Sequence, residues 1–289
     1  MGRFARALVC VVSAWLALGR TALADTAEAD PVEALHSIAF FYGRQPPLDA
    51  LAHYDAAVIE ADHGFRPPAA TVPPSRPTWY AYVSVGEVNP SRAFFSEIPR
   101  GWLRGTNDAW QSSVVDQTAP GWPAFLVEKV VAPLWRQGYR GFFLDTLDSY
   151  QLVATTDAAR AAQQAGLVAV VRTIHARFPG AYLILNRGFE LLPAIHDIVD
   201  AVAFESLFRS WDQTRQHYVE VAPQDRDWLL GRARVVRDQY RLPLISIDYC
   251  DPADPACAVR TAASIRALGI VPWVADGGLQ TMGIGNPAD

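Results

Sequence analysis

The stretch WPAFLVEKVVAPLWRQGYRGFFLDTL, residues 122–147, gives the clearest indication of the fold of this chain. Residues 122–137 have the composition of an amphipathic helix, and the continuous apolar run GFFL follows shortly after and ends on Asp145. A short apolar run that does not alternate is typical of a parallel strand covered by helices on both faces. The helix followed by this strand therefore predicts one unit of a β/α fold.

The same pattern extends over the rest of the chain. Eight short apolar runs bounded by turn residues are candidate strands: residues 37–43, 56–60, 78–88, 141–147, 181–186, 201–207, 242–249 and 271–275. Helical segments precede four of them, at 122–137, 157–178, 225–240 and 257–268. Eight such strands predict a single-domain (β/α)8 TIM barrel over residues 36–289, and no G-x-G-x-x-G motif supports a dinucleotide-binding sheet instead. The long aromatic-rich connection 89–120 is expected to form a wall of the active site.

The N-terminus has the pattern of a secretory signal. Arginines precede the apolar run 7–18, and the ALA sequence at 22–24 matches an A-x-A cleavage site. We predict a signal peptide at residues 1–24, an N-terminal extension at 25–35, and a secreted or periplasmic mature protein without a membrane contact. A retained anchor is the less favoured alternative, because the run is shorter than the about 20 residues that span a bilayer.

The charge balance of the mature chain is acidic. The full sequence has a formal net charge of -5, and removal of residues 1–24 takes away Arg3, Arg6 and Arg20 but no acid, which leaves -8. Nucleic-acid binding requires clustered cations that neutralise phosphates, and no such cluster is present in the sequence. A neutral or cationic partner is therefore expected.

Two cysteines, Cys250 and Cys257, remain after signal removal. In an oxidising compartment a pair this close in sequence predicts a disulfide, with two free thiols as the alternative. C-x6-C is not a zinc spacing, and the histidines lack an H-E-x-x-H pattern, so neither a metal nor a cofactor is predicted. The sequence also lacks the G-x-S-x-G elbow of serine hydrolases and the Walker loop of nucleotide-binding proteins.

Polar residues terminate the apolar runs, where a β/α barrel places its reacting groups. They are Tyr42, Glu60, Glu87, Asp145, Asn186 with Arg187, Glu205, Asp248 with Tyr249, and Asp276. Any one acid among them can be explained by a salt bridge or a helix cap. Their number at one end of the predicted barrel favours a functional site.

Asp145 and Glu205 directly follow the apolar residues that begin the fourth and sixth predicted strands, so both are expected at the strand ends that face the barrel mouth. Two facing carboxylates suit cleavage of a glycosidic bond: one donates a proton to the leaving oxygen, and the other attacks the anomeric carbon or activates water. The apolar neighbour Phe204 favours Glu205 as the acid/base and Asp145 as the nucleophile, with the reverse assignment left open. We expect the shorter carboxyl separation that is typical of retaining enzymes.

Around this pair we expect further substrate contacts. The candidates are Tyr42, Glu60, Tyr82, Glu87, Asp148, Asn186, Arg187, Asp248, Tyr249 and Asp276. Asn186 suits a hydrogen bond to a sugar hydroxyl, and Arg187 can hold a carboxylate ionised or brace the acids. Asp148 has the alternative of capping the next helical segment. Tyrosine rings can stack on pyranose faces, with packing in the core as the alternative.

Four segments resemble a known family: SIAFFYGRQPP at 37–47, AYVSVGEV at 81–88, GFFLDTLDSY at 141–150 and AFESL at 203–207. They are similar to the endo-α-1,4-polygalactosaminidases of glycoside hydrolase family 114 and to the related hydrolase domains of Pel exopolysaccharide modification proteins. The resemblance covers nearly all of the mature chain. The loop CDPADPAC at 250–257 departs from the family pattern.

The resemblance implies a (β/α)8 barrel that hydrolyses α-1,4 linkages in a galactosamine-rich polysaccharide, with Asp145 and Glu205 as the catalytic pair and no metal. A partly deacetylated galactosamine polymer is cationic, in agreement with the acidic mature chain. Two alternatives stay open: a catalytically silent carbohydrate-binding barrel, and a barrel glycosidase of other amino-sugar specificity.

Overall fold

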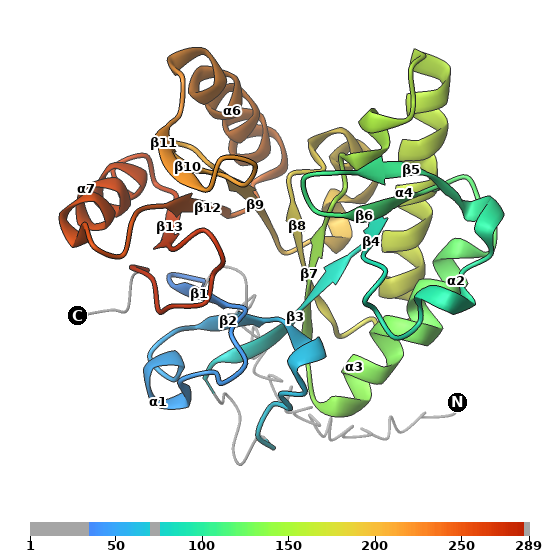
Figure 1. The fold of residues 1–289 in the computed structure, drawn as a ribbon, viewed down its shortest axis with the longest axis horizontal. Helices are drawn as coiled ribbons and strands as arrows, with labels where there is room; N and C mark the ends of the chain where they lie inside the picture. The colour runs from blue at the N-terminus through green and yellow to red at the C-terminus, as the bar shows by residue number, and fades with distance from the viewer. Residues whose placement is uncertain (1–34, 70–75, 286–289) are drawn as a thin grey trace, which may run out of the picture.

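Eight parallel strands stand side by side in sequence order and curve into a nearly closed barrel (Figure 1). The computed structural model describes residues 35–69 and 76–285. The strands are β1 (Ile38–Phe41), β2 (Ala56–Ile59), β3 (Thr78–Ser84), β7 (Gly141–Asp145), β8 (Tyr182–Asn186), β9 (Ala201–Glu205), β12 (Leu244–Tyr249) and β13 (Val271–Ala275). The sequence predicted all eight, and the single-domain barrel is confirmed.

The last strand does not pair with the first. In the order β1-β2-β3-β7-β8-β9-β12-β13, β1 and β13 are the two ends of the sheet. The free edge of β13 is taken by the chain beyond it, because Val274 exchanges both backbone hydrogen bonds with Ile284 at 2.9 and 2.7 Å. The same segment reaches the other end of the sheet, where the Tyr42 amide donates to the Leu279 carbonyl at 2.6 Å. The C-terminal segment therefore bridges the gap.

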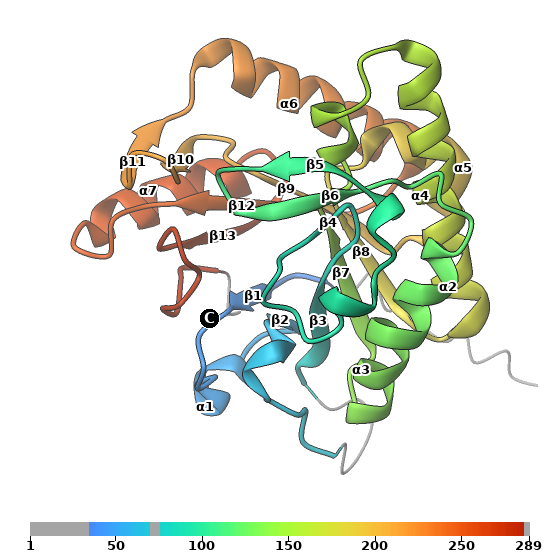
Figure 2. The same ribbon diagram turned by 45° about the vertical axis from the view of Figure 1, so that its right-hand side comes forward.

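Helices cover the outer surface unevenly (Figures 1 and 2). They are α1 (Leu48–Leu51), α2 (Trp122–Leu126), α3 (Ala132–Gln137), α4 (Asp157–Arg177), α5 (Leu192–Ile195), α6 (Pro223–Val235) and α7 (Pro255–Arg266). A π-helical turn at Val127–Val131 joins α2 to α3, so the predicted helix 122–137 is continuous. A second one, Val236–Tyr240, extends α6. The helix predicted at 157–178 is the longest, and Thr156 caps it by accepting from the Ala159 amide at 3.1 Å.

Two small antiparallel sheets lie outside the barrel. One consists of β4 (Glu87–Val88), β6 (Ser112–Val115) and β5 (Leu103–Asn107), and the other of β10 (Arg209–Asp212) and β11 (His217–Glu220). We call residues 87–115 the arm and residues 209–220 the hairpin. The prediction of one strand over 78–88 is thus wrong at its end. The strand ends at Ser84: the Val85 amide still donates to the Asp145 carbonyl of β7 at 3.0 Å, but it shares the Thr146 hydroxyl, at 3.1 Å, with the Gly86 amide, at 2.8 Å.

The core consists of the side chains that the apolar runs supply. Trp122, Trp273, Tyr139, Phe40, Phe142, Phe143 and Phe204 are among its largest fully buried members. Cys250 and Cys257 form the predicted disulfide, with their Cα atoms 6.1 Å apart. The predicted signal peptide and most of the predicted extension lie outside the described residues. Among the helices of residues 35–69 and 76–285, none is long and apolar enough to cross a membrane.

Two helical glycines give opposite predictions for the same substitution. Gly231 in α6 has open space around its missing Cβ, so Gly231→Ala should raise the free energy of unfolding by about 1 kcal/mol through helix propensity. A Cβ on Gly166 in α4 would lie 2.0 Å from the Gln117 carbonyl oxygen, so Gly166→Ala should lower it by about 1 kcal/mol or more. Urea unfolding measures both, and equal effects would contradict the close packing of α4.

Candidate active site

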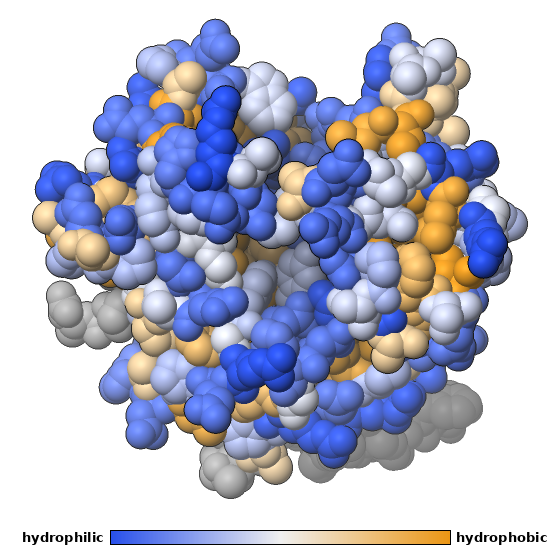
Figure 3. Space-filling view, viewed as in Figure 1, coloured by the Kyte–Doolittle hydropathy of each residue, from blue (hydrophilic) through white to orange (hydrophobic). Residues whose placement is uncertain are grey.

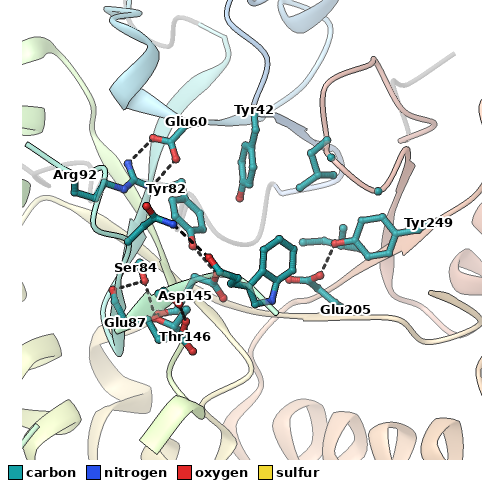
Figure 4. A pocket seen from close by; sticks show the side chains of 17 residues that line it. Tyr42, Glu60, Tyr82, Ser84, Glu87, Arg92, Asp145, Thr146, Glu205 and Tyr249 are labelled. Atoms are coloured by element: carbon teal, nitrogen blue, oxygen red, sulfur yellow. Dashed lines mark hydrogen bonds and ion pairs between the residues drawn. The ribbon is translucent and has the colours of Figure 1, made fainter. Parts of the chain in front are cut away.

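The carboxyl ends of the barrel strands surround a cavity of about 290 Å³ (Figure 4). In the space-filling view, the centre of this face of the molecule is hollowed and has hydrophilic residues around it (Figure 3). The residues that line the cavity are Tyr42, Glu60, Tyr82, Ser84, Glu87, Asn89, Arg92, Trp110, Ser112, Asp145, Thr146, Glu205, Ile247, Tyr249, Gly277, Gly278 and Leu279. Seven of the twelve predicted site residues are in this set: Tyr42, Glu60, Tyr82, Glu87, Asp145, Glu205 and Tyr249.

One amide group joins the two carboxylates that the sequence singled out. The Asn186 side-chain nitrogen donates to Asp145 Oδ1 at 2.7 Å and to Glu205 Oε1 at 2.8 Å. These two oxygens are therefore no more than 5.5 Å apart. Asn186 is 7% exposed and comes from β8, which lies between the strands of the two acids. It supports the pair from below and does not line the cavity.

Two tyrosines complete the hydrogen bonds of the pair (Figure 4). The Tyr82 hydroxyl donates to Asp145 Oδ2 at 2.8 Å, and the Tyr249 hydroxyl donates to Glu205 Oε2. Each carboxylate thus accepts one bond from a tyrosine and one from Asn186. The Tyr42 ring packs edge-on against Tyr82, with their centroids 5.2 Å apart. Hydrogen bonds fix the orientation of both acids.

The backbone turns sharply after each of these strands. Thr146, Arg187 and Ser206 directly follow Asp145, Asn186 and Glu205, and their φ angles are 63°, 58° and 65°. This left-handed conformation costs a residue other than glycine about 1 kcal/mol or more, and such costs concentrate at functional sites. Three consecutive strands of the sheet therefore end in the same strained turn, directly after the residues that meet at the cavity.

Burial changes the acidity of Asp145. Desolvation, followed by the negative charge of Glu205, raises the pKa of Asp145 from 3.8 to about 6, although hydrogen bonds from Tyr82 and Asn186 act in the opposite direction. The sequence argument favoured Asp145 as the ionised nucleophile. In the structure, burial and the second carboxylate outweigh the hydrogen bonds that favour the ionised form. Asp145 therefore exchanges its proton near pH 6.

Comparison with known proteins agrees with this geometry. The model of glycoside-hydrolase family GH114 matches residues 19–286. The chain belongs to glycoside hydrolase family GH114. Among solved structures, the glycoside hydrolase domain of PelA from Pseudomonas aeruginosa is 39% identical, with a TM-score of 0.78, and the match covers 86% of this chain and 97% of that one. This GH114 chain is thus related over nearly its whole barrel.

Two more distant matches are consistent with that assignment. An uncharacterized protein of Deinococcus radiodurans is 26% identical over 223 residues, which are 72% of this chain and 67% of the relative. Ega3 of Aspergillus fumigatus, solved in complex with galactosamine, has a TM-score of 0.62 at 12% identity, over 87% of this chain and 95% of that one. At that identity the likeness shows a shared fold.

Four predicted substrate ligands of this GH114 barrel lie away from the cavity lining. Asp248 is fully buried, and its carboxylate accepts from the Phe208 and Arg209 amides, each at 2.7 Å. Asp276 accepts from the amides at 278, 280 and 281 and shapes the turn after β13. Both carboxylates thus bind backbone amides.

The other two, Asp148 and Arg187, form an ion pair of 3.6 Å. Asp148 makes no capping hydrogen bond to the short helix that follows it, so the capping role considered for it is wrong. The expectation that Arg187 braces an acid agrees with this contact, which involves Asp148 and neither Asp145 nor Glu205.

Several lining residues of the GH114 site carried little signal in the sequence. Ser84, Asn89, Arg92, Ser112, Thr146 and the segment 277–279 were not predicted. Arg92 forms a two-pronged ion pair with Glu60, at 2.9 and 2.7 Å. Arg92 lies in the long connection 89–120, which the sequence analysis expected to form a wall of the active site. This position was the sequence signal for Arg92. No group of three or more His, Cys, Asp or Glu side chains suited to a metal occurs in the described part of the chain.

The raised pKa of Asp145 gives a prediction for stability. A pKa raised from 3.8 to about 6 on folding contributes stability that is fully present below pH 3.8 and is lost as pH rises through about 6. Asp145→Asn does not titrate. The unfolding free energy of Asp145→Asn relative to that of the wild type should therefore increase by up to about 3 kcal/mol between about pH 4 and about pH 8. Urea unfolding across this range measures it; a constant difference would show that Asp145 is not buried beside a second charge.

Proposed function

We propose that this GH114 protein is a secreted glycoside hydrolase that cleaves α-1,4 linkages inside a galactosamine-rich polysaccharide. The observation that carries the proposal is the pair of carboxylates, Asp145 and Glu205, held by one amide at the mouth of a barrel. Glycosidic cleavage needs two such groups, one protonated and one ionised, on either side of the bond. The family and the geometry support the reaction class independently.

The proposed reaction uses one proton carried by the carboxylate pair. One carboxyl group donates it to the glycosidic oxygen as that bond breaks, and the other carboxylate attacks the anomeric carbon to form a covalent glycosyl–enzyme. Water then hydrolyses this ester, and the first group takes the proton of the water back. Asn186, Tyr82 and Tyr249 orient both carboxylates, which reduces the rearrangement needed in the transition state.

A cationic sugar fits the charge of the cavity. Four carboxylates line it, those of Glu60, Glu87, Asp145 and Glu205, whereas Arg92 contributes the one cationic side chain among the lining residues. A net negative, partly enclosed surface concentrates cations. The negative charge predicted for the mature chain has the same sign. The relative Ega3, solved with galactosamine, supports an amino sugar as the substrate class.

The proposed reaction predicts that activity depends on the two acids. Purified residues 25–289 should release reducing ends from a partially deacetylated α-1,4-galactosamine polymer. Glu205→Gln and Asp145→Asn should each lower the rate at least about a hundredfold, because each removes a group that transfers a proton or attacks carbon. A reducing-sugar assay measures the rate.

Glu128→Gln is the matched control, since Glu128 is exposed and outside the cavity. Its rate should equal that of the wild type. If the wild-type protein binds the polymer without releasing reducing ends, the protein is a carbohydrate-binding barrel. Cleavage of other glycans at a higher rate in the same assay would instead redefine its specificity.

The separation of the carboxyl groups predicts the stereochemistry of the reaction. Carboxyl groups about 5–5.5 Å apart are typical of retaining enzymes, whereas inverting enzymes separate them by about 6.5–9.5 Å. The oxygens of Asp145 and Glu205 that accept from Asn186 are no more than 5.5 Å apart, and this distance supports retention. Proton NMR of the earliest products should show the α-anomer; initial release of the β-anomer would contradict the two-step reaction.

The roles within the pair are separated by a substrate with a good leaving group. An activated aryl glycoside needs little help from an acid, so it should rescue formation of the glycosyl–enzyme when the acid/base is replaced, but not when the nucleophile is replaced. The sequence favours Glu205 as the acid, whereas the raised pKa of Asp145 favours the reverse in the free protein. Rescue of Glu205→Gln alone supports the first assignment, and rescue of Asp145→Asn alone supports the second.

A further inference from the structure

Trp110 is a large exposed side chain at the mouth of the cavity. Its exposed fraction is 57%, and it lines the same cavity as Asp145 and Glu205. It stands in the turn between β5 and β6 of the arm, outside the barrel. Exposed apolar residues scattered over a surface need no explanation, but an indole next to two facing carboxylates in a concave site is well placed to bind a ligand.

The turn that carries Trp110 is clamped at both ends. The Glu87 carboxylate accepts a hydrogen bond from Asn107 at 2.9 Å, just before the turn, and another from Ser112, just after it. Asn89 donates to the carbonyl of Trp110 at 3.3 Å. Because both strands of the turn bond to one carboxylate, the backbone that carries the indole is held in place before any ligand arrives.

Glu87 is itself buried, with 3% of its surface exposed. Burial of a carboxylate is costly unless hydrogen bonds satisfy it. A third donor, the Ser149 hydroxyl at 2.5 Å, comes from the segment that follows β7 and Asp145. Glu87 therefore ties the arm to the strand that ends on Asp145, and this contact explains why a charge is buried at this place.

We propose that Trp110 is a sugar-binding platform for the pyranose unit next to the one whose glycosidic bond is cleaved. Glu87 is a positioning residue for Trp110. The apolar face of a hexopyranose ring can stack on the indole, and an amino group on that ring adds a cation–π attraction. The rigid turn lowers the entropy cost of binding. The inference rests on the proposed function, because it assumes that the ligand is a saccharide chain.

The test is calorimetric binding of an α-1,4-galactosamine oligosaccharide to the Glu205→Gln protein, with and without Trp110→Ala. Loss of the indole should weaken binding about tenfold, and Trp110→Phe should restore part of the affinity. Trp228→Ala is the matched control, since Trp228 is 47% exposed on α6 and does not line the cavity. Unchanged affinity in a folded Trp110→Ala protein overturns the proposal. If Glu205→Gln does not fold, KM of Trp110→Ala in the otherwise wild-type protein takes its place.

A double-mutant cycle tests the role of Glu87. Glu87→Gln should weaken binding when Trp110 is present and should add little once Trp110 is replaced, because both changes act through one contact. Additive losses would show that Glu87 contacts the sugar directly. Binding that depends on Trp110 in a wild-type protein without turnover would refute the hydrolase and keep the platform. Turnover with affinity unaffected by Trp110→Ala would do the opposite.

Discussion

The site depends on the hydrogen bonds that the side-chain amide of Asn186 donates. Two carboxylates whose oxygens lie within 5.5 Å repel each other when both are ionised, and their burial increases that repulsion. A neutral amide with two N–H groups can donate to both without adding charge. A lysine in the same place would neutralise one acid and remove the proton that the pair must share. The barrel makes this arrangement possible, because it sets Asn186 on the strand between those of Asp145 and Glu205.

Around Asn186, the barrel strands provide the reacting groups, and segments outside the barrel provide the walls of the cavity. The reacting groups and their tyrosines come from the barrel strands, whereas Arg92, Trp110 and Ser112 come from the long excursion between β3 and β7. Loops carried on a rigid scaffold commonly supply binding residues, and here Val88 and Val115 anchor the arm in the core. A buried carboxylate, Glu87, attaches the arm to the barrel at the base of its turn. Substrate contacts on the arm therefore have a fixed relation to the acids.

The sequence predicted the strands well because runs buried on both faces have a simple signature. It identified Asp145 and Glu205 for the same reason, since each directly ends such a run. Asp248 shows where this reasoning stops. Adjacent strand residues point to opposite faces, and here Tyr249 reaches Glu205 while Asp248 is turned towards the backbone of residues 207–209. An apolar run without alternation does not show which of two terminal polar residues faces the cavity. The arm and the hairpin depend on tertiary contacts that no local pattern encodes.

The incomplete closure of the barrel has a consequence for the site. Since β1 and β13 do not pair, the chain after β13 enters the gap and contributes Gly277, Gly278 and Leu279 to the cavity. The hairpin supports this segment: the Trp211 ring lies where a side chain on Gly277 would be, with 2.4 Å between its atoms and an added Cβ. Only glycine permits that approach, and the Gly277 amide also donates to the Tyr218 hydroxyl at 3.3 Å. One side of the cavity thus rests on two segments far apart in sequence, and its shape follows from a gap that a fully closed barrel would not have.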